Sequence, residues 1–129
     1  MSERKPIAGL RHVALNVTDL EACEQFYISL VGMTVEWRPD ADNVYLTSGA
    51  DNLALHRAAS PAAAQAQRLD HIGFVLVSAE EVSRWHDYLR AQGVTMKTAP
   101  KAHRDGSHSF YCLDPDGTIV QFIYHPPLL

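Results

Sequence analysis

Two histidines occupy matching places in two similar halves of this 129-residue chain. His12 lies within a short apolar run at residues 10–17, and His71 lies within a similar run at residues 69–77. Neutral imidazole is a common ligand of divalent transition metals, so two imidazoles brought to one place could share one ion. The first question that the sequence raises is therefore whether a third ligand exists.

The elements that position the first histidine follow from the pattern of apolar residues. Apolar and polar residues alternate over residues 11–17, which predicts a strand with His12 on the face opposite the core. A capping box at residues 18–21 and apolar residues at helical spacing predict a helix that ends at Gly32. Three further strands are predicted at residues 34–38, 43–47 and 52–56.

The second half of the chain repeats this plan. A second capping box at residues 78–81 begins an amphipathic stretch that ends at Gly93. Equivalent residues recur in the same order in both halves, which indicates an internal duplication. We expect one α+β domain over residues 1–129, with two βαβββ modules at about 9–57 and 68–126 and a linker at about 58–67. Each helix would cover one face of its own sheet, and the opposite faces would curve toward a shared cleft.

Composition excludes several classes of protein. The net charge of −4 gives no basic footprint for nucleic acid, and no apolar run approaches the ~20 residues that span a bilayer. The polar N-terminal residues lack the apolar core of a secretion signal. Cys23 and Cys112 lie far apart in sequence and are expected to be buried free thiols. These features predict a cytoplasmic protein with no membrane partner.

Some conspicuous side chains are expected to be structural. His86, beside Trp85 on the second predicted helix, is expected at the surface. Trp37 and Trp85 are expected to pack against other residues, and not to form stacking platforms for a ligand.

An aromatic strand followed by an Asp-Pro-Asp-Gly turn occupies residues 109–117. In such a turn, proline presets φ and glycine accepts positive φ. Together with the two histidine runs and with residues 25–33, this segment resembles the vicinal oxygen chelate superfamily, which includes glyoxalase I, bleomycin-binding proteins and extradiol dioxygenases. The resemblance extends from about Gly9 to His125. It implies two βαβββ modules in an open mixed sheet around a cleft. The modules pair either within one chain or across a dimer, and we expect the protein to be a homodimer.

The resemblance also implies a set of metal ligands. Metal-dependent members take ligands from the first and last strands of the modules, and His12 and His71 match the first-strand positions. Gln121 takes the position where most of these metalloenzymes have Glu, so a divalent Fe, Mn, Zn or Ni ion would lose the attraction of a carboxylate. Ala54 takes the fourth position, which disfavours a centre like that of glyoxalase I. His56, two residues beyond Ala54, is an alternative ligand or a substrate contact.

His103 and Tyr111 are the candidate catalytic residues. His103 precedes Tyr111 at a distance that resembles the acid–base histidine of extradiol dioxygenases, and histidine suits proton transfer because its pKa lies near neutrality. His108 is the alternative in the same loop. Tyr111 and Tyr45 either line the cleft or pack in the core. By strand parity, His125 points inward as well.

Two functions are consistent with these residues. The first is a metal-dependent enzyme of the dioxygenase, lyase or isomerase type, acting on a small substrate that chelates the metal through oxygens. The alternative is a metal-free protein of the bleomycin-resistance type that binds or sequesters a small molecule. The missing carboxylate at Gln121 motivates the alternative.

Overall fold

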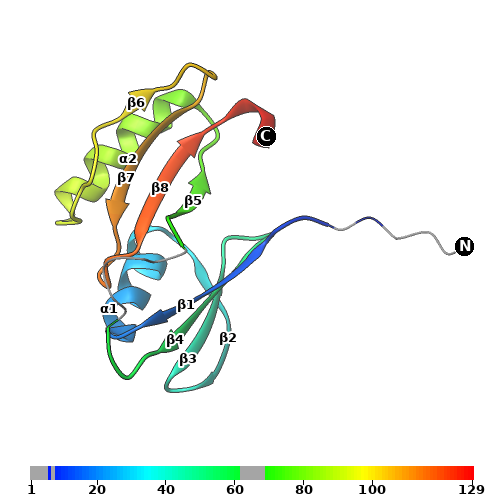
Figure 1. The fold of residues 1–129 in the computed structure, drawn as a ribbon, viewed down its shortest axis with the longest axis vertical. Helices are drawn as coiled ribbons and strands as arrows, with labels where there is room; N and C mark the ends of the chain where they lie inside the picture. Colours follow the sequence, from blue (N-terminus) through cyan, green and yellow to red (C-terminus); the bar gives the residue numbers. More distant parts are fainter. Residues whose placement is uncertain (1–5, 7, 62–68) are drawn as a thin grey trace, which may run out of the picture.

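The computed structural model describes residues 6, 8–61 and 69–129, and the predicted linker falls partly outside them (Figure 1). The first module comprises β1 (His12–Val17), α1 (Leu20–Glu24), the π-helical segment η1 (Gln25–Leu30), β2 (Thr34–Asp40), β3 (Asn43–Thr47) and β4 (Asn52–Arg57). The second comprises β5 (Ile72–Val75), α2 (Ala79–Ala91), β6 (Lys101–Ala102), β7 (His108–Leu113), β8 (Ile119–Tyr124) and a final 3-10 turn, η2 (Pro126–Leu128). Both modules have the order βαβββ, which confirms the predicted α+β fold.

The two sheets have the same topology. Their strand orders are β1-β4-β3-β2 and β5-β8-β7-β6, and in each sheet the first strand is parallel to the last. Two glycines end the helical segments as predicted, because Gly32 and Gly93 adopt φ values of +98° and +86°. Among the described residues the two sheets remain separate and form no closed barrel.

One core joins both modules. α2 covers one face of the second sheet, where the Phe122 ring stacks with Trp85 and Phe110 at centroid distances of 5.3 and 5.2 Å. α1 and η1 lie between the first sheet and the second module (Figure 1). The ring centroids of Tyr27 in η1 and Phe74 in β5 are 6.3 Å apart. The helices and the apolar faces thus share one interior. The helix-free face of each sheet is left open, and these two faces carry the candidate site residues.

The turn between β7 and β8 ties the modules together through two carboxylates. The buried Asp114 accepts a hydrogen bond from Tyr27 Oη at 2.7 Å and two more from the backbone N–H groups of Asp116 and Thr118. Burial, reinforced by Asp114, raises the pKa of Tyr27 well above its usual range, so the phenol keeps its proton and remains a donor. Asp116 accepts from the backbone N–H and the hydroxyl of Thr18.

This turn explains why one predicted helix cap is wrong. The sequence pattern assigned the cap of the first helix to Thr18, but Asp19 takes this position and accepts from the Ala22 N–H at 3.0 Å. The Thr18 hydroxyl is bound instead by Asp116, which lies 98 residues away in sequence. A long-range carboxylate therefore displaces the local capping pattern.

One expectation about a single side chain, His86, is also wrong. His86 is only 8% exposed, because its spacing from Val82 and Leu89 puts it on the inner face of α2, where its ring meets Phe110 edge-on at 5.2 Å. Trp37 packs against another residue as expected, because it stacks on the Tyr45 ring with a centroid distance of 5.2 Å. It does so on the open face of the first sheet, where it is 58% exposed.

The cysteines agree with the prediction. Cys23 and Cys112 are both buried and free. Burial raises the pKa of each thiol to about 12, so both stay protonated and are poor nucleophiles at neutral pH. None of the helices in the described part of the chain is long and apolar enough to cross a membrane.

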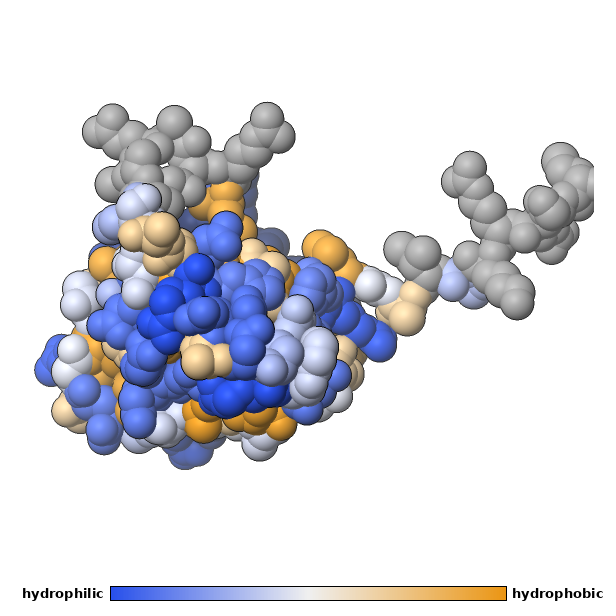
Figure 2. Space-filling model, turned by 90° about the horizontal axis from the view of Figure 1, so that it is seen from below, coloured by the Kyte–Doolittle hydropathy of each residue, from blue (hydrophilic) through white to orange (hydrophobic). Residues whose placement is uncertain are grey.

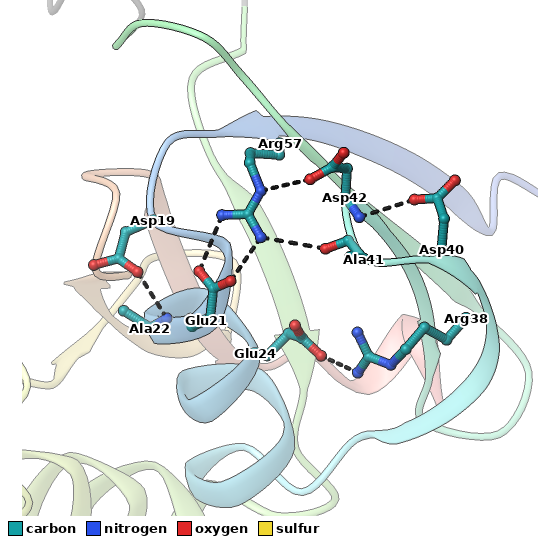
Figure 3. A network of polar contacts seen from close by, with 9 residues as sticks. All are labelled: Asp19, Glu21, Ala22, Glu24, Arg38, Asp40, Ala41, Asp42 and Arg57. Atoms are coloured by element: carbon teal, nitrogen blue, oxygen red, sulfur yellow. Dashed lines mark hydrogen bonds and ion pairs between the residues drawn. The ribbon is translucent and has the colours of Figure 1, made fainter.

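A network of ion pairs fastens α1 to the strands of the first sheet (Figure 3). The Arg57 guanidinium at the end of β4 donates to both carboxylate oxygens of Glu21, at 2.6 and 3.0 Å, and to Asp42 at 2.8 Å. Arg38 of β2 pairs with Glu24. The hydrogen bonds from Arg57 are the main cause that lowers the pKa of Glu21 to about 2.

This lowered pKa predicts a loss of stability in acid. Because the folded pKa of Glu21 lies below its usual value of 4.5, the unfolded chain binds more protons between these values. The contribution of Glu21 is present above about pH 4.5 and is lost as pH falls toward about 2. Between about pH 5 and about pH 3, the urea midpoint of Glu21→Gln should fall less than that of the wild type. Glu80 forms no ion pair in the described part of the chain, so Glu80→Gln gives a matched control. An equal fall of the urea midpoint between these pH values in Glu21→Gln and Glu80→Gln would contradict the prediction.

Candidate functional site

His12 is oriented by a neighbouring strand. β1 and β4 are parallel and in register, so His12 lies beside Asn52, and its Nδ1 donates to Asn52 Oδ1 at 2.6 Å. Asn52 Nδ2 in turn donates to the Glu36 carboxylate, which can only accept, and this fixes the orientation of the amide. In a neutral ring, His12 therefore carries its proton on Nδ1 and presents Nε2 as the nitrogen with a free lone pair. An outer partner on the other ring nitrogen is typical of metal-binding histidines.

Glu36 reaches this face because β2 is irregular. Val35 pairs with Leu46 and Trp37 pairs with Tyr45, so Glu36 is an extra residue in β2 that has no partner in β3. Such a bulge changes the direction of the side chains that follow it. The bulge allows Glu36 and Trp37, which are adjacent in sequence, to serve the same open face.

His56 has a similar arrangement farther along the first sheet. Its Nδ1 donates to Asn43 Oδ1 at 2.6 Å, and Asn43 Nδ2 donates to Asp40 at 2.8 Å. The Tyr45 ring meets the His56 ring edge-on at 5.9 Å. Ala54 lies on the same face of β4 as His56, is almost fully buried and offers no ligand.

The open face of the first sheet is polar. Seen from below the view of Figure 1, the molecule is largely hydrophilic, with smaller hydrophobic areas among the polar ones (Figure 2). Polar side chains on this face come from three neighbouring strands: His12, Asn16, Asn43, Asn52 and His56. A face of this kind favours contacts with a polar ligand or with water.

The open face of the second sheet brings three candidate residues into direct contact. His71 donates from Nδ1 to the Asp70 carboxylate at 2.7 Å, so that in a neutral ring the free lone pair is again on Nε2. The Tyr111 ring meets the His71 ring edge-on at 5.2 Å. Gln121, only 9% exposed, donates from Nε2 to Tyr111 Oη at 3.1 Å. Its carbonyl Oε1 faces Gly73 of β5, which has no side chain.

Two cavities border these residues. The first, about 720 Å³, is lined by both His12 and His71, together with Asn52 and apolar side chains of both modules. The second, about 560 Å³, is lined by Tyr111 and Gln121. The contact of Tyr111 with His71 means that the two cavities share a wall.

The predicted residues are thus only partly brought together. His103 lines the second cavity with Tyr111 and Gln121, whereas His56 lines neither cavity. Within the described ranges, no three His, Cys, Asp or Glu side chains gather closely enough to hold a metal ion.

His103, and not His108, is placed to act in the second cavity. His103 Nε2 and Ser109 Oγ are joined by a hydrogen bond of 3.0 Å. His108 pairs with Tyr124 and points to the opposite face of β7, where its ring lies 6.3 Å from the Tyr124 ring. His125 has a buried Nδ1 with no hydrogen-bond partner in the described part of the chain.

Sequence reasoning missed the residues that orient the histidines. Asp70 directly precedes His71, and this adjacency was a usable signal. Asn52 and Glu36 gave no local signal, because their relation to His12 depends on strand pairing across 40 residues and on a bulge.

Solved structures share this fold. An integron cassette protein from the mobile metagenome of a Halifax Harbour sewage outfall is 25% identical, with a TM-score of 0.78, and the match covers 92% of this chain and all of that one. A lactoylglutathione lyase from Agrobacterium tumefaciens is 24% identical, with a TM-score of 0.77 and coverage of 93% and 96%. A glyoxalase-related enzyme from Fulvimarina pelagi is 20% identical, with a TM-score of 0.72 and coverage of 93% and 90%.

Comparison of sequences identifies the family. No curated protein matches the chain. The model of the Glyoxalase/Bleomycin resistance protein/Dioxygenase superfamily matches residues 9–122, which include both modules and both first-strand histidines. The duplicated βαβββ fold, the paired histidines on the open faces and this match agree, and the chain belongs to that superfamily.

Proposed function

We propose that this protein is a metal-dependent enzyme acting on a small substrate with two neighbouring oxygens. One observation carries the proposal: His12 and His71 border the same cavity, and each has its Nδ1 proton held by an oxygen that only accepts. Both rings therefore offer Nε2, and the tautomer is set before any ligand arrives. Surface histidines without a function need no such partners on both sheets.

The donor atoms fit a divalent ion. Two imidazole nitrogens and Oε1 of Gln121 would form a neutral N₂O set, which suits Fe, Mn, Zn or Ni. We assign His12 and His71 as the main ligands, with Gln121 as the third and His56 as the alternative. When bound, the ion supplies Lewis-acid stabilisation of negative charge that develops on the substrate oxygens.

The chain's own groups supply the remaining chemistry. Tyr111 receives a hydrogen bond from Gln121, so its own hydroxyl proton remains free to donate to a substrate oxygen. His103, held by Ser109, lies on the same cavity and is the candidate for moving a proton to or from the substrate. The buried amide of Gln121 orients Tyr111 in this arrangement.

Elemental analysis of the protein, purified without a His-tag or chelator, tests the proposal. We expect Fe, Mn, Zn or Ni near one equivalent per chain, and a Gln121→Glu variant should bind the ion more tightly because a carboxylate adds charge attraction. If the native protein holds no metal and takes none up on titration, the proposal is wrong. If only the Gln121→Glu variant binds a metal, the site is a former metal centre that has lost its ligand.

Metal binding by the Gln121→Glu variant alone would favour a metal-free binding protein. The observation behind this candidate is that Gln121 is neutral, mostly buried and already hydrogen-bonded, as expected for a residue that shapes a cavity. Affinity for a small ligand that survives exhaustive chelation would support it.

We also propose that the chain works in the cytoplasm as a homodimer. Two buried free thiols are typical of a reducing compartment. Members of the superfamily act on small molecules and commonly form dimers. Several large apolar residues on β2 and near β5 are exposed and suit contact with a second copy: Val35, Trp37, Leu69, Val75 and Val77. Analytical ultracentrifugation should give twice the chain mass of 14.3 kDa, and a monomer at micromolar concentrations would refute the dimer.

A further inference from the structure

We propose that the cavity beside β6 binds the anionic group of a small organic substrate, a compact oxyanion such as a carboxylate or a phosphate. This inference extends the proposed function, because the cavity is the one that Tyr111, Gln121 and His103 border. It concerns groups that the metal proposal does not use, chiefly Lys101 and Arg104.

Strand register places a cation on the open face. β6 pairs with β7 so that Lys101 lies beside Ser109, and Ser109 lies beside Ile123 of β8. Residues paired in this way share a face of the sheet, so Lys101 stands in the row next to Tyr111 and Gln121. The backbone pairing continues past β6, since the His103 N–H donates to the Ser107 carbonyl at 2.8 Å. Lys101 and His103 are thus held by strand pairing at the rim of the cavity.

Basic side chains outnumber acidic ones at this rim, which is lined by Lys101, Arg104 and Asp105. In the described part of the chain, neither Lys101 nor Arg104 forms an ion pair, although the chain as a whole has a net charge of −4. The Asp105 carboxylate accepts from the backbone N–H and the hydroxyl of Ser107 within its own turn. Two cations and one carboxylate leave a net positive charge along one concave site, and this charge attracts an anion.

Neutral groups complete a site for an organic anion. The Tyr111 hydroxyl accepts from Gln121 and can donate its own proton outward. Ile123 offers an apolar wall between these polar groups. Charge-assisted hydrogen bonds from Lys, Arg and Tyr to an oxyanion are stronger than neutral ones. The arrangement therefore fits a ligand with one charged end and a small apolar body.

Calorimetric titration at neutral pH with three probes tests this inference. Salicylate carries a carboxylate, phenyl phosphate carries a phosphate, and salicylamide is a neutral analogue of salicylate. The titrations are made on the full chain after treatment with EDTA and dialysis into chelator-free buffer, so that neither a bound metal nor a competing carboxylate plays a part. We expect salicylate or phenyl phosphate to bind and salicylamide to bind at least ~10-fold more weakly, which follows from the loss of a charged hydrogen-bond partner. The tighter of the two anions identifies the carboxylate or the phosphate as the preferred group.

Variants then locate the site. The double variant Lys101→Gln, Arg104→Gln should weaken anion binding at least ~10-fold and leave salicylamide unaffected. A control that removes the same charge elsewhere, Arg90→Gln with Lys97→Gln, should bind like the wild type, because neither residue lines the cavity. Raising the salt concentration should weaken anion binding to the wild type more than to the Lys101/Arg104 variant.

Three results would overturn the inference: no anion bound by the wild type, equal affinity for salicylamide, or equal loss in the control variant. None of them depends on metal content. Elemental analysis, by contrast, decides the metal proposal without reference to Lys101 or Arg104, so failure of either idea can be told from failure of the other.

Discussion

Simultaneous replacement of His12 and His71 by alanine is expected to abolish metal binding and turnover. Each histidine has its Nδ1 proton held by a neighbouring oxygen, so both substitutions remove a prepared Nε2 donor. Loss of a single outer partner typically weakens metal affinity by about 10–100-fold, and loss of two ligands should exceed this. Calorimetric titration with Zn²⁺ or Ni²⁺ measures the effect.

Two variants calibrate this result. Asn52→Ala keeps the His12 ring but removes the oxygen that orients it, and an intermediate loss of about 10–100-fold is expected. His108→Ala removes an imidazole from the opposite face of β7 and should change metal affinity little. Wild-type stoichiometry and affinity in the His12/His71 double variant would rule out the two-histidine site.

The largest effect on stability is expected for Asp114→Ala. The Asp114 carboxylate is 4% exposed and accepts from Tyr27 Oη and from the N–H groups of Asp116 and Thr118. Its removal leaves three donors without their partner in or near the core. Each unsatisfied buried group costs about 1–3 kcal/mol, and with partial access of water the sum should be ~3–5 kcal/mol. The free energy of unfolding in urea measures this cost.

Tyr27→Phe separates the two parts of this effect. It removes one donor and leaves Asp114 with its two backbone partners, so a loss of about 1.5–3 kcal/mol is expected. The slope of the urea transition should stay unchanged in both variants. If Asp114→Ala costs no more than Tyr27→Phe, the backbone hydrogen bonds of the turn contribute nothing to stability.

The sequence predicts the fold well where the determining pattern is local. The strand predicted at residues 43–47 agrees with β3 at both ends, and Gly32 and Gly93 end their helical segments as the left-handed cap requires. Alternation and helical spacing are properties of neighbouring residues, so they can be read without knowing the pairing of strands. The module boundaries at about 9–57 and 68–126 stay predictions.

Features that depend on distant partners could not be predicted in this way. The Thr18 hydroxyl donates to Asp116 and does not cap its own helix. The bulge at Glu36 inserts a residue that no local pattern reveals. For the site, duplication alone indicated the His12 and His71 pair. The free cations at Lys101 and Arg104 became meaningful only when strand pairing placed them beside a cavity.

The two β-turns that close the modules have diverged in what they hold. In the first module, Asp51 accepts from the N–H and the hydroxyl of its own turn residue Ser48, so that turn is self-contained. The equivalent acids of the second module, Asp114 and Asp116, bind Tyr27 and Thr18 of the other half. The two modules are thus unequal: the first depends on hydrogen bonds that acids of the second accept. A chain assembled from two first modules would keep its turns but would lose the hydrogen bonds that join the two halves.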